Sequence, residues 1–374
     1  MTALKNIINY LENFGPQTFA QMPFNELDAT ILAQLAYLDY TILERQPSYK
    51  FAAINDQKLL KSAIKQTWNP QANLKLLQAL QKSRRYQNLK WHNWETKTNV
   101  KAEEQFSAVT LEFAPKQYFV AFRGTTSTLV DWKEDFNMTF LETIPSQKSA
   151  LQYYQRMTRL HPGRFYIGGH SKGGNLATYA AIHSQGMAQQ VLKGAYSIDG
   201  PGLKTPLPLT IKVKIHKFIP EASIVGLLLE PEANYQVVKS NGAGIKQHDP
   251  FTWQIKNNHF QLIAAPNELS QFTQHTVTNW LTSLDDATKQ EFLDSLYTIL
   301  KNIDADQIDN IEQNWLTTLK LLAPEILNSK NETKQQWRFV TNKLLNSIFA
   351  EAKIIIDTKR PHLEQLYSKQ LKKH

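Results

Sequence analysis

The stretch RFYIGGHSKGGNLAT occupies residues 164–178 and contains a Gly-x-Ser-x-Gly sequence centred on Ser171. A short apolar run leads into it, and a helix-forming stretch, NLATYAAIHS, follows it. A strand, a sharp turn and a helix in this order distinguish a nucleophile elbow from a chance match. So sharp a turn excludes bulky side chains, which explains the glycines at positions 168, 169, 173 and 174. The pattern predicts that the Ser171 hydroxyl projects from a sheet edge, at a helix N-terminus that favours developing negative charge.

Composition narrows the class of protein and its surroundings. With 374 residues, 42% of them hydrophobic, the chain has room for one large domain with an appendage, or for two domains. The absence of cysteine excludes disulfides, cysteine nucleophiles and thiolate metal sites, and fits a reducing compartment. The N-terminus does not have a signal-peptide pattern, and no apolar run is long enough for a transmembrane helix. These features predict a cytoplasmic protein.

The net charge of +9 raises the question of an anionic partner. Lys212, Lys214 and Lys217 recur at near-alternating positions, so they could form a basic face that contacts anionic lipid headgroups. A solvated surface explains the same lysines more simply. No nucleic-acid partner is expected, because no recognised nucleic-acid module accompanies them.

The order of periodic segments predicts an α/β fold. Residues 1–95 are expected to be mainly helical, and residues 146–160 form another helix. Expected strands are residues 106–113, 117–124, 164–169, 194–199, 211–219, 235–240 and 251–256. Strands separated by helices indicate a central, mostly parallel sheet flanked by helices. Successive amphipathic stretches beyond residue 265 predict a helical region, giving domains at 1–264 and 265–374.

A serine nucleophile needs a base, and the base needs an orienting carboxylate. In a strand–elbow–helix hydrolase the chain order is serine, acid, histidine, so the histidine lies downstream of Ser171. His248 is the best placed, because it follows a glycine-rich loop after the strand at 235–240. His259 is the alternative.

Three carboxylates compete for the role of the acid. Glu221 is ranked first, since it follows the strand at 211–219 and the break at Pro220. Asp199 is second, because it ends a strand that comes one strand earlier than usual, and an Asx-type turn or helix cap also explains it. Asp249 is third.

The oxyanion hole requires two donors. The backbone N–H of Lys172 is one expected donor, and the loop after residues 117–122, with Gly124 and Thr125, supplies the other. Arg123 is expected to pair with Asp131 or Asp135. A Ser–Lys dyad with Lys172 is disfavoured, because adjacent residues at a sharp turn project in different directions.

These segments resemble the α/β-hydrolase superfamily, and most closely the class 3, fungal-type lipases. AFRGT at 121–125 matches their oxyanion loop, and GHSKGGNLA at 169–177 matches their elbow. The resemblance implies Ser171 as nucleophile, His248 as base, and the Thr125 and Lys172 amides as oxyanion donors. Its acid is an aspartate near a proline, so Glu221 after Pro220 departs from the pattern. VDWKEDFNM, DGPG and QHDPFTW further resemble an uncharacterised bacterial lipase-like family, over about residues 20–260.

The resulting hypothesis is a serine hydrolase that cleaves carboxylic esters, with an ester or lipid as its small-molecule substrate. Neither a metal nor an organic cofactor is required by this chemistry. The apolar run SIVGLLL at 223–229 fits an acyl substrate, although a buried helix or strand explains it equally well. The alternative hypothesis is an inactive hydrolase fold that serves as a binding or scaffold protein.

Overall fold

The computed structural model describes residues 6–45, 48–125, 134, 137–138, 141–230 and 233–288. The chain divides into two compact units, Met1–Asn267 and Glu268–His374. In the second unit the described residues include helix α11 (Glu268–Thr282). The prediction that the C-terminal region is helical falls largely on residues 289–374, which lie outside the described part of the chain.

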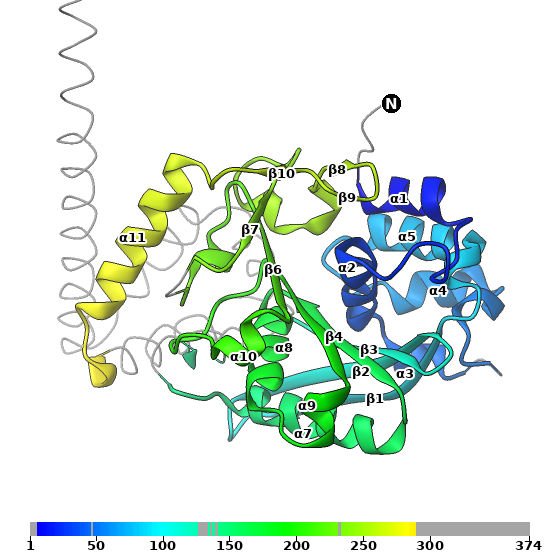
Figure 1. The fold of residues 1–374 in the computed structure, drawn as a ribbon, viewed down its shortest axis with the longest axis horizontal. Helices are drawn as coiled ribbons and strands as arrows, with labels where there is room; N and C mark the ends of the chain where they lie inside the picture. The colour runs from blue at the N-terminus through cyan, green and yellow to red at the C-terminus, as the bar shows by residue number, and fades with distance from the viewer. Residues whose placement is uncertain are drawn as a thin grey trace, which may run out of the picture. The chain divides into compact units, whose positions relative to one another are not determined.

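A single eight-stranded sheet forms the centre of the first unit (Figure 1). Its spatial order is β1-β2-β3-β4-β5-β6-β7-β10. The strands are β1 (Lys90–Asn99), β2 (Glu104–Ala114), β3 (Gln117–Phe122), β4 (Arg164–His170), β5 (Leu192–Ile198), β6 (Ile215–Pro220), β7 (Gln236–Val238) and β10 (Leu262–Ile263). Strands β3 to β7 are parallel, whereas β1, β2 and β10 pair antiparallel with their neighbours. The predicted α/β class with a mostly parallel central sheet is confirmed.

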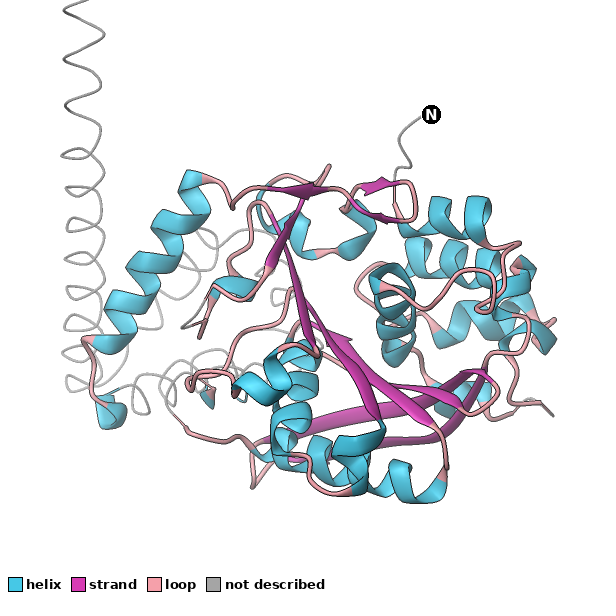
Figure 2. Cartoon of the chain, in the orientation of Figure 1, coloured by secondary structure: helices cyan, strands magenta, loops and turns pink. Residues whose placement is uncertain are grey.

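Helices cover both faces of this sheet (Figure 2). The helices and 3-10 turns N-terminal to the sheet are α1 (Ile7–Phe14), α2 (Glu26–Gln34), η1 (Leu35–Tyr37), α3 (Tyr40–Leu43), η2 (Phe51–Ala53), α4 (Gln57–Ala63), α5 (Pro70–Lys82) and η3 (Arg84–Tyr86). Those within or after it are α7 (Pro145–Leu160), α8 (Lys172–His183), α9 (Met187–Val191), α10 (Leu209–Lys212), η4 (Val225–Leu227), η5 (Gly244–His248) and η6 (Pro250–Thr252).

Strand alternation divides the buried apolar residues into two layers. Phe119 and Ala121 of β3 point toward the N-terminal helices. They belong to the same buried layer as Leu27 and Leu32 of α2. Val120 of β3 faces the other way, among residues of α7 and α8. Because successive side chains of a strand point to opposite faces, one continuous apolar strand supplies both layers.

Three segments differ from the sequence prediction. Residues 90–95, the end of the region expected to be mainly helical, form the first part of β1. This edge strand is largely polar, and an irregularity between His92 and Glu95 interrupts its alternation. Part of the expected strand 211–219 is helix α10, which begins after Pro208. Residues 251–256 contain the end of η6 and only a short strand, β8 (Ile255–Lys256). It pairs with β9 (His259–Phe260) in a separate sheet. The η6 turn replaces the start of the expected strand because Asp249 caps it by accepting from the Phe251 N–H.

The parallel register brings several strand ends to one edge of the sheet. His170 at the end of β4 lies opposite Ile198 of β5, and Ile198 lies opposite Phe218 of β6. Residues that directly follow these strands therefore lie close together. This edge carries the candidate site.

Candidate active site

Ser171 lies in a sharp turn between β4 and α8. Its backbone has φ 57° and ψ −133°, a region that residues with a side chain rarely adopt. Two hydrogen bonds hold it there: the Ser171 N–H donates to Ile198 O at 2.9 Å, and the Gly174 N–H donates to Ser171 O at 2.8 Å. Ser171 is half-buried, at the N-terminus of a helix whose first turn consists of backbone donors.

Close backbone contacts explain the glycines around this turn. A Cβ on Gly173 would lie 2.2 Å from Phe122 O, and one on Gly169 would lie 2.4 Å from the Gly173 carbonyl carbon. Gly124, just after β3, approaches the serine itself, because its Cβ would be 3.1 Å from Ser171 Cβ. Any side chain at these positions would separate β3, β4 and α8.

His248 and Asp199 form a hydrogen-bonded pair at the same sheet edge as Ser171. His248 Nδ1 lies 2.6 Å from Asp199 Oδ2, and the aspartate side chain is 1% exposed, against 18% for the histidine. The carboxylate accepts, so Nδ1 carries a proton, and a ring with this single proton has Nε2 as its acceptor nitrogen. Asp199 directly follows β5, whose neighbour β4 leads into Ser171.

Glu221, the first-ranked acid, does not occupy this position. In the described part of the chain it makes no hydrogen bond or ion pair with His248. Its backbone N–H donates to Val238 O, and its carbonyl accepts from the Asn267 N–H. Glu221 follows β6, which is one strand farther from β4 than β5 is. The carboxylate that bonds His248 is thus the second-ranked one, Asp199.

Ser223 is a partner of Asp199 that the sequence analysis missed. Its hydroxyl donates to Asp199 Oδ1 at 2.5 Å, while Oδ2 accepts from His248. Gly226 closes the pocket around this carboxylate, since a Cβ there would lie 2.3 Å from Asp199 Oδ1. The sequence carries no recognisable motif for this role, because Ser223 begins the apolar run 223–229. That run contains the short turn η4 (Val225–Leu227), with Leu227 buried and Ile224 exposed, so it is neither a strand nor a continuous helix.

The other candidates have structural partners. His259 Nδ1 lies 2.8 Å from Glu26 Oε1, and the histidine side chain is 59% exposed. Asp249 accepts from Asn69 and from the Phe251 N–H, and burial raises its pKa. Neither residue bonds Ser171 or His248 within the residues that the structure describes.

Lys172 directly follows Ser171, and its side chain forms an ion pair with Glu134. Its Nζ lies 3.1 Å from Glu134 Oε2, and both side chains are buried. Glu134 also accepts from the backbone N–H groups of Gln105 and Ser146. An ammonium held in this way cannot serve as the base for Ser171, in line with the rejection of a Ser–Lys dyad.

The predicted oxyanion loop is described only in part. Gly124 and the half-buried Thr125 follow β3 at the same edge as Ser171. Asp131 and Asp135, the expected partners of Arg123, lie outside the described residues.

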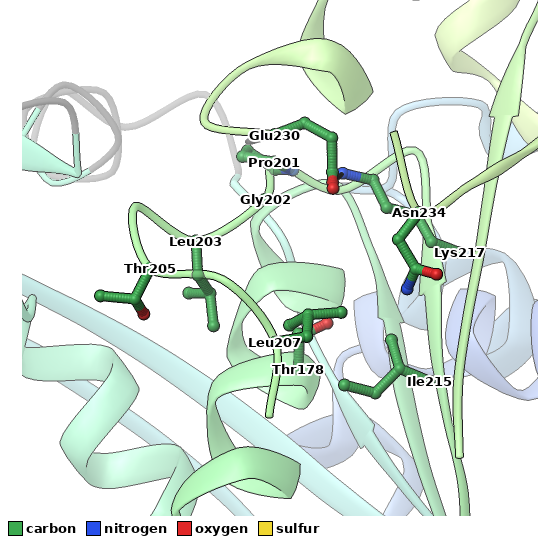
Figure 3. A pocket seen from close by; sticks show the side chains of 10 residues that line it. All are labelled: Thr178, Pro201, Gly202, Leu203, Thr205, Leu207, Ile215, Lys217, Glu230 and Asn234. Carbon is green, nitrogen blue, oxygen red and sulfur yellow. Dashed lines mark hydrogen bonds and ion pairs between the residues drawn. The ribbon is translucent and has the colours of Figure 1, made fainter. Parts of the chain in front are cut away.

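The predicted basic face needs a correction. Lys217 is buried and forms an ion pair with Glu230, because its position in β6 points into the protein. Figure 3 shows the two side chains meeting beside a small pocket, whose lining includes Leu203, Leu207 and Ile215. Burial lowers the pKa of Lys217, and the neighbouring Glu230 opposes that effect.

Lys212 and Lys214 come immediately before β6, at the N-terminal end of a parallel strand. Ser171 and Asp199 follow the opposite strand ends, so these lysines and the candidate site lie at opposite edges of the sheet. No described helix has the length and apolar character needed to cross a membrane. Membrane contact and a cytoplasmic location remain predictions.

The described residues do not form a metal-binding cluster. Within the described ranges, no three His, Cys, Asp or Glu side chains are grouped closely enough to hold a metal ion.

Comparisons with known proteins give one family and a set of lipase structures. The model of the Mbeg1-like family matches residues 80–298, more than half of the chain. Lipase II from Rhizopus niveus is 14% identical, with a TM-score of 0.35, over 66% of this chain and 88% of that one. The native Rhizomucor miehei lipase propeptide complex is 16% identical, with a TM-score of 0.35, over 62% and 71% of the two chains. No curated protein matches the chain. The predicted similarity to fungal lipases is thus found again among solved structures.

Proposed function

The chain belongs to the Mbeg1-like family, and we propose that it is a serine hydrolase that cleaves carboxylic esters. In this proposal Ser171 is the nucleophile, His248 the general base and Asp199 the orienting acid. The observation that carries it is the 2.6 Å bond between His248 Nδ1 and Asp199 Oδ2, at the sheet edge where Ser171 occupies a strained turn. A buried carboxylate that fixes one histidine tautomer, at the same sheet edge as a half-buried serine turn, is the arrangement that serine activation requires.

The first half of the reaction acylates the serine. His248 Nε2 accepts the Ser171 hydroxyl proton as Oγ forms a bond to the ester carbonyl carbon. The tetrahedral intermediate then collapses, its bond to the alkoxide oxygen breaks, and the imidazolium gives the proton to the leaving alcohol. Asp199 stabilises the imidazolium through its bond to Nδ1–H, and Ser223 keeps the carboxylate oriented.

The second half repeats these steps with water as the nucleophile. His248 takes a proton from water, whose oxygen attacks the acyl carbon, and Ser171 Oγ leaves with that proton. The products are a carboxylic acid and the regenerated serine. In both halves the oxyanion receives hydrogen bonds from the Lys172 N–H and from the Gly124–Thr125 segment. The close approach of Gly124 to Ser171 supports this assignment.

The substrate in this proposal is an ester with an apolar acyl group. Support comes from residues 223–229, which begin at Ser223 beside Asp199 and include the exposed Ile224 and the half-buried Leu228. Apolar side chains on the segment that contacts Asp199 favour an acyl chain over a polar substituent.

Covalent labelling by a fluorophosphonate probe tests the proposal. The purified wild type is expected to be labelled, and Ser171→Ala, His248→Ala and Asp199→Asn should lose most or all of the labelling. Loss of one triad member typically lowers the rate by a factor of roughly 10³ or more.

Glu221→Gln is the matched control, because it removes the competing carboxylate from the end of β6. It should be labelled at the wild-type rate, and circular dichroism should show every variant folded. An unlabelled wild type would overturn the proposal and leave the binding or scaffold alternative. Equal losses in Glu221→Gln and Asp199→Asn would overturn the choice of acid.

A further inference from the structure

His170, the residue before Ser171, has an enclosed imidazole ring that is not part of the proposed proton transfer. Its Nε2 lies 2.7 Å from the backbone oxygen of His248, and the two rings have centroids 4.5 Å apart. A carbonyl oxygen only accepts, so Nε2 carries the proton of the His170 ring. Burial, together with the neighbouring His248, holds the pKa of His170 well below its usual value, so the ring is neutral.

The tautomer leaves Nδ1 of His170 as an acceptor, and Tyr37 supplies the donor. The Tyr37 hydroxyl lies 3.1 Å from His170 Nδ1 and 3.3 Å from His170 O. Gly124 packs against the same hydroxyl, since a Cβ on Gly124 would lie 2.4 Å from it. One tyrosine therefore contacts both the Ser171 turn and the segment proposed to carry the oxyanion donors.

These bonds restrain His248 at two points. Asp199 holds the side chain through Nδ1, and His170 holds the main chain through the carbonyl. His248 ends η5, a short 3-10 turn in a loop rather than a residue of the sheet, so its backbone has few ladder hydrogen bonds. An anchor at its carbonyl therefore fixes where the imidazole can lie.

Tyr37 ends η1, in the N-terminal helical segment, outside the residues 80–298 that the family model matches. We propose that Tyr37 and His170 are positioning residues, which hold the backbone of His248 so that its Nε2 faces Ser171. This inference rests on the proposed function. It makes the N-terminal segment a part of the catalytic apparatus as well as a cover for one face of the sheet.

Two variants of His170 separate positioning from simple packing. His170→Ala removes the donor, whereas the side-chain amide of His170→Gln can still donate to the His248 carbonyl. We expect fluorophosphonate labelling to slow by roughly 10- to 100-fold in His170→Ala, because a displacement of about 1 Å has effects of that order. His170→Gln should recover most of the rate. Tyr37→Phe should slow labelling roughly two- to tenfold, the effect of one neutral hydrogen bond.

Tyr154→Phe and His216→Ala are the matched controls. The Tyr154 hydroxyl of α7 donates to Ala188 O of α9, and His216 of β6 stacks on Tyr196 of β5. Both should be labelled at the wild-type rate, which shows that the loss of a buried hydroxyl or imidazole elsewhere has no such effect.

Proton NMR of the His248 Nδ1–H provides a readout that does not need a reactive serine. This proton, bonded to Asp199, should give a downfield resonance that stays sharp in His170→Gln and exchanges rapidly in His170→Ala. Wild-type labelling rates and an unchanged resonance in His170→Ala and Tyr37→Phe would overturn the inference while leaving the proposed function intact. Absence of labelling in the wild type would overturn the proposed function, and the resonance would still decide whether His170 holds His248.

Discussion

Lys172 Nζ lies 3.1 Å from Glu134 Oε2, and the two side chains are 1% and 0% exposed. The residue that follows Ser171 is thereby joined to a residue beyond β3, and the same carboxylate accepts from the backbone at Gln105 and Ser146. This ion pair connects α8, β2 and α7 behind the Ser171 turn.

Breaking the pair should destabilise the protein strongly. Lys172→Ala leaves Glu134 buried without its counter-ion, and such changes reduce the free energy of unfolding by about 3–5 kcal/mol. Urea unfolding followed by circular dichroism measures the change. Lys90→Ala removes the half-exposed pair with Glu112 and should alter stability by less than about 1 kcal/mol. Equal stabilities of Lys172→Ala and Lys90→Ala would contradict this account.

Ser223→Ala should slow fluorophosphonate labelling without removing the triad. Its hydroxyl bonds the carboxylate of Asp199, and a hydrogen bond to a charged group contributes about 1.5–3 kcal/mol. We expect a decrease of roughly 10- to 100-fold in the labelling rate. Ser149→Ala is the control, because the Ser149 hydroxyl bonds the Glu104 carboxylate away from the site. A Ser223→Ala variant as fast as Ser149→Ala would show that Asp199 does not need this donor.

The free energy of unfolding should decrease as the pH is lowered below about 6.5, the usual pKa of histidine. Burial lowers the pKa of His170, so the unfolded chain binds a proton in a pH range where the folded protein does not. This difference makes the free energy of unfolding decrease as the pH falls, by up to about 1.4 kcal/mol per unit for one group. His161 and His216, whose pKa values burial also lowers, add to the same slope.

Urea midpoints at several pH values between 7.5 and 5 measure this effect. His170→Gln has no imidazole to titrate at this position, so its slope should be smaller than that of the wild type. Parallel slopes would refute the assignment of a neutral, buried His170.

Lys217 and Lys212 should behave differently despite their proximity in sequence. Lys217→Ala leaves Glu230 buried without its cation and should reduce the free energy of unfolding by about 3–5 kcal/mol. Lys212→Ala, at the end of α10, should reduce it by less than about 1 kcal/mol. Thermal unfolding of both variants measures this difference in stability. A loss of liposome binding in Lys217→Ala alone would therefore report damage to the fold, not a lost lipid contact.

The features that the sequence predicts well are those encoded in contiguous residues. A strand, a glycine-rich turn and a helix lie within residues 164–183, so local sterics alone specify the Ser171 turn. His248 could be selected because a loop histidine after a strand near the end of the sheet has few competitors.

The choice of acid depended instead on which strand ends meet in space. Glu221 and Asp199 both follow strands, and only the three-dimensional paths of these strands decide which carboxylate reaches His248. Tyr37 and Ser223 lie in no recognisable motif, since their roles come from contacts across more than one element. The edge strand β1 was missed because its polar residues and its irregularity hide the alternation of a half-buried strand.

The backbone at Ser171 and Asp199 bears on how this protein evolves. Both residues have positive φ values, 57° and 47°, which cost a residue with a side chain roughly 1–2 kcal/mol and cost glycine little. Relief of this backbone strain favours glycine at both positions, whereas the bonds of the Asp199 carboxylate to His248 and Ser223 oppose it at position 199. Descendants that have abandoned catalysis should accumulate glycine at position 171, and glycine or asparagine at position 199. The residue types at positions 171 and 199 therefore separate lineages that still use the site from lineages that do not, without knowledge of the substrate.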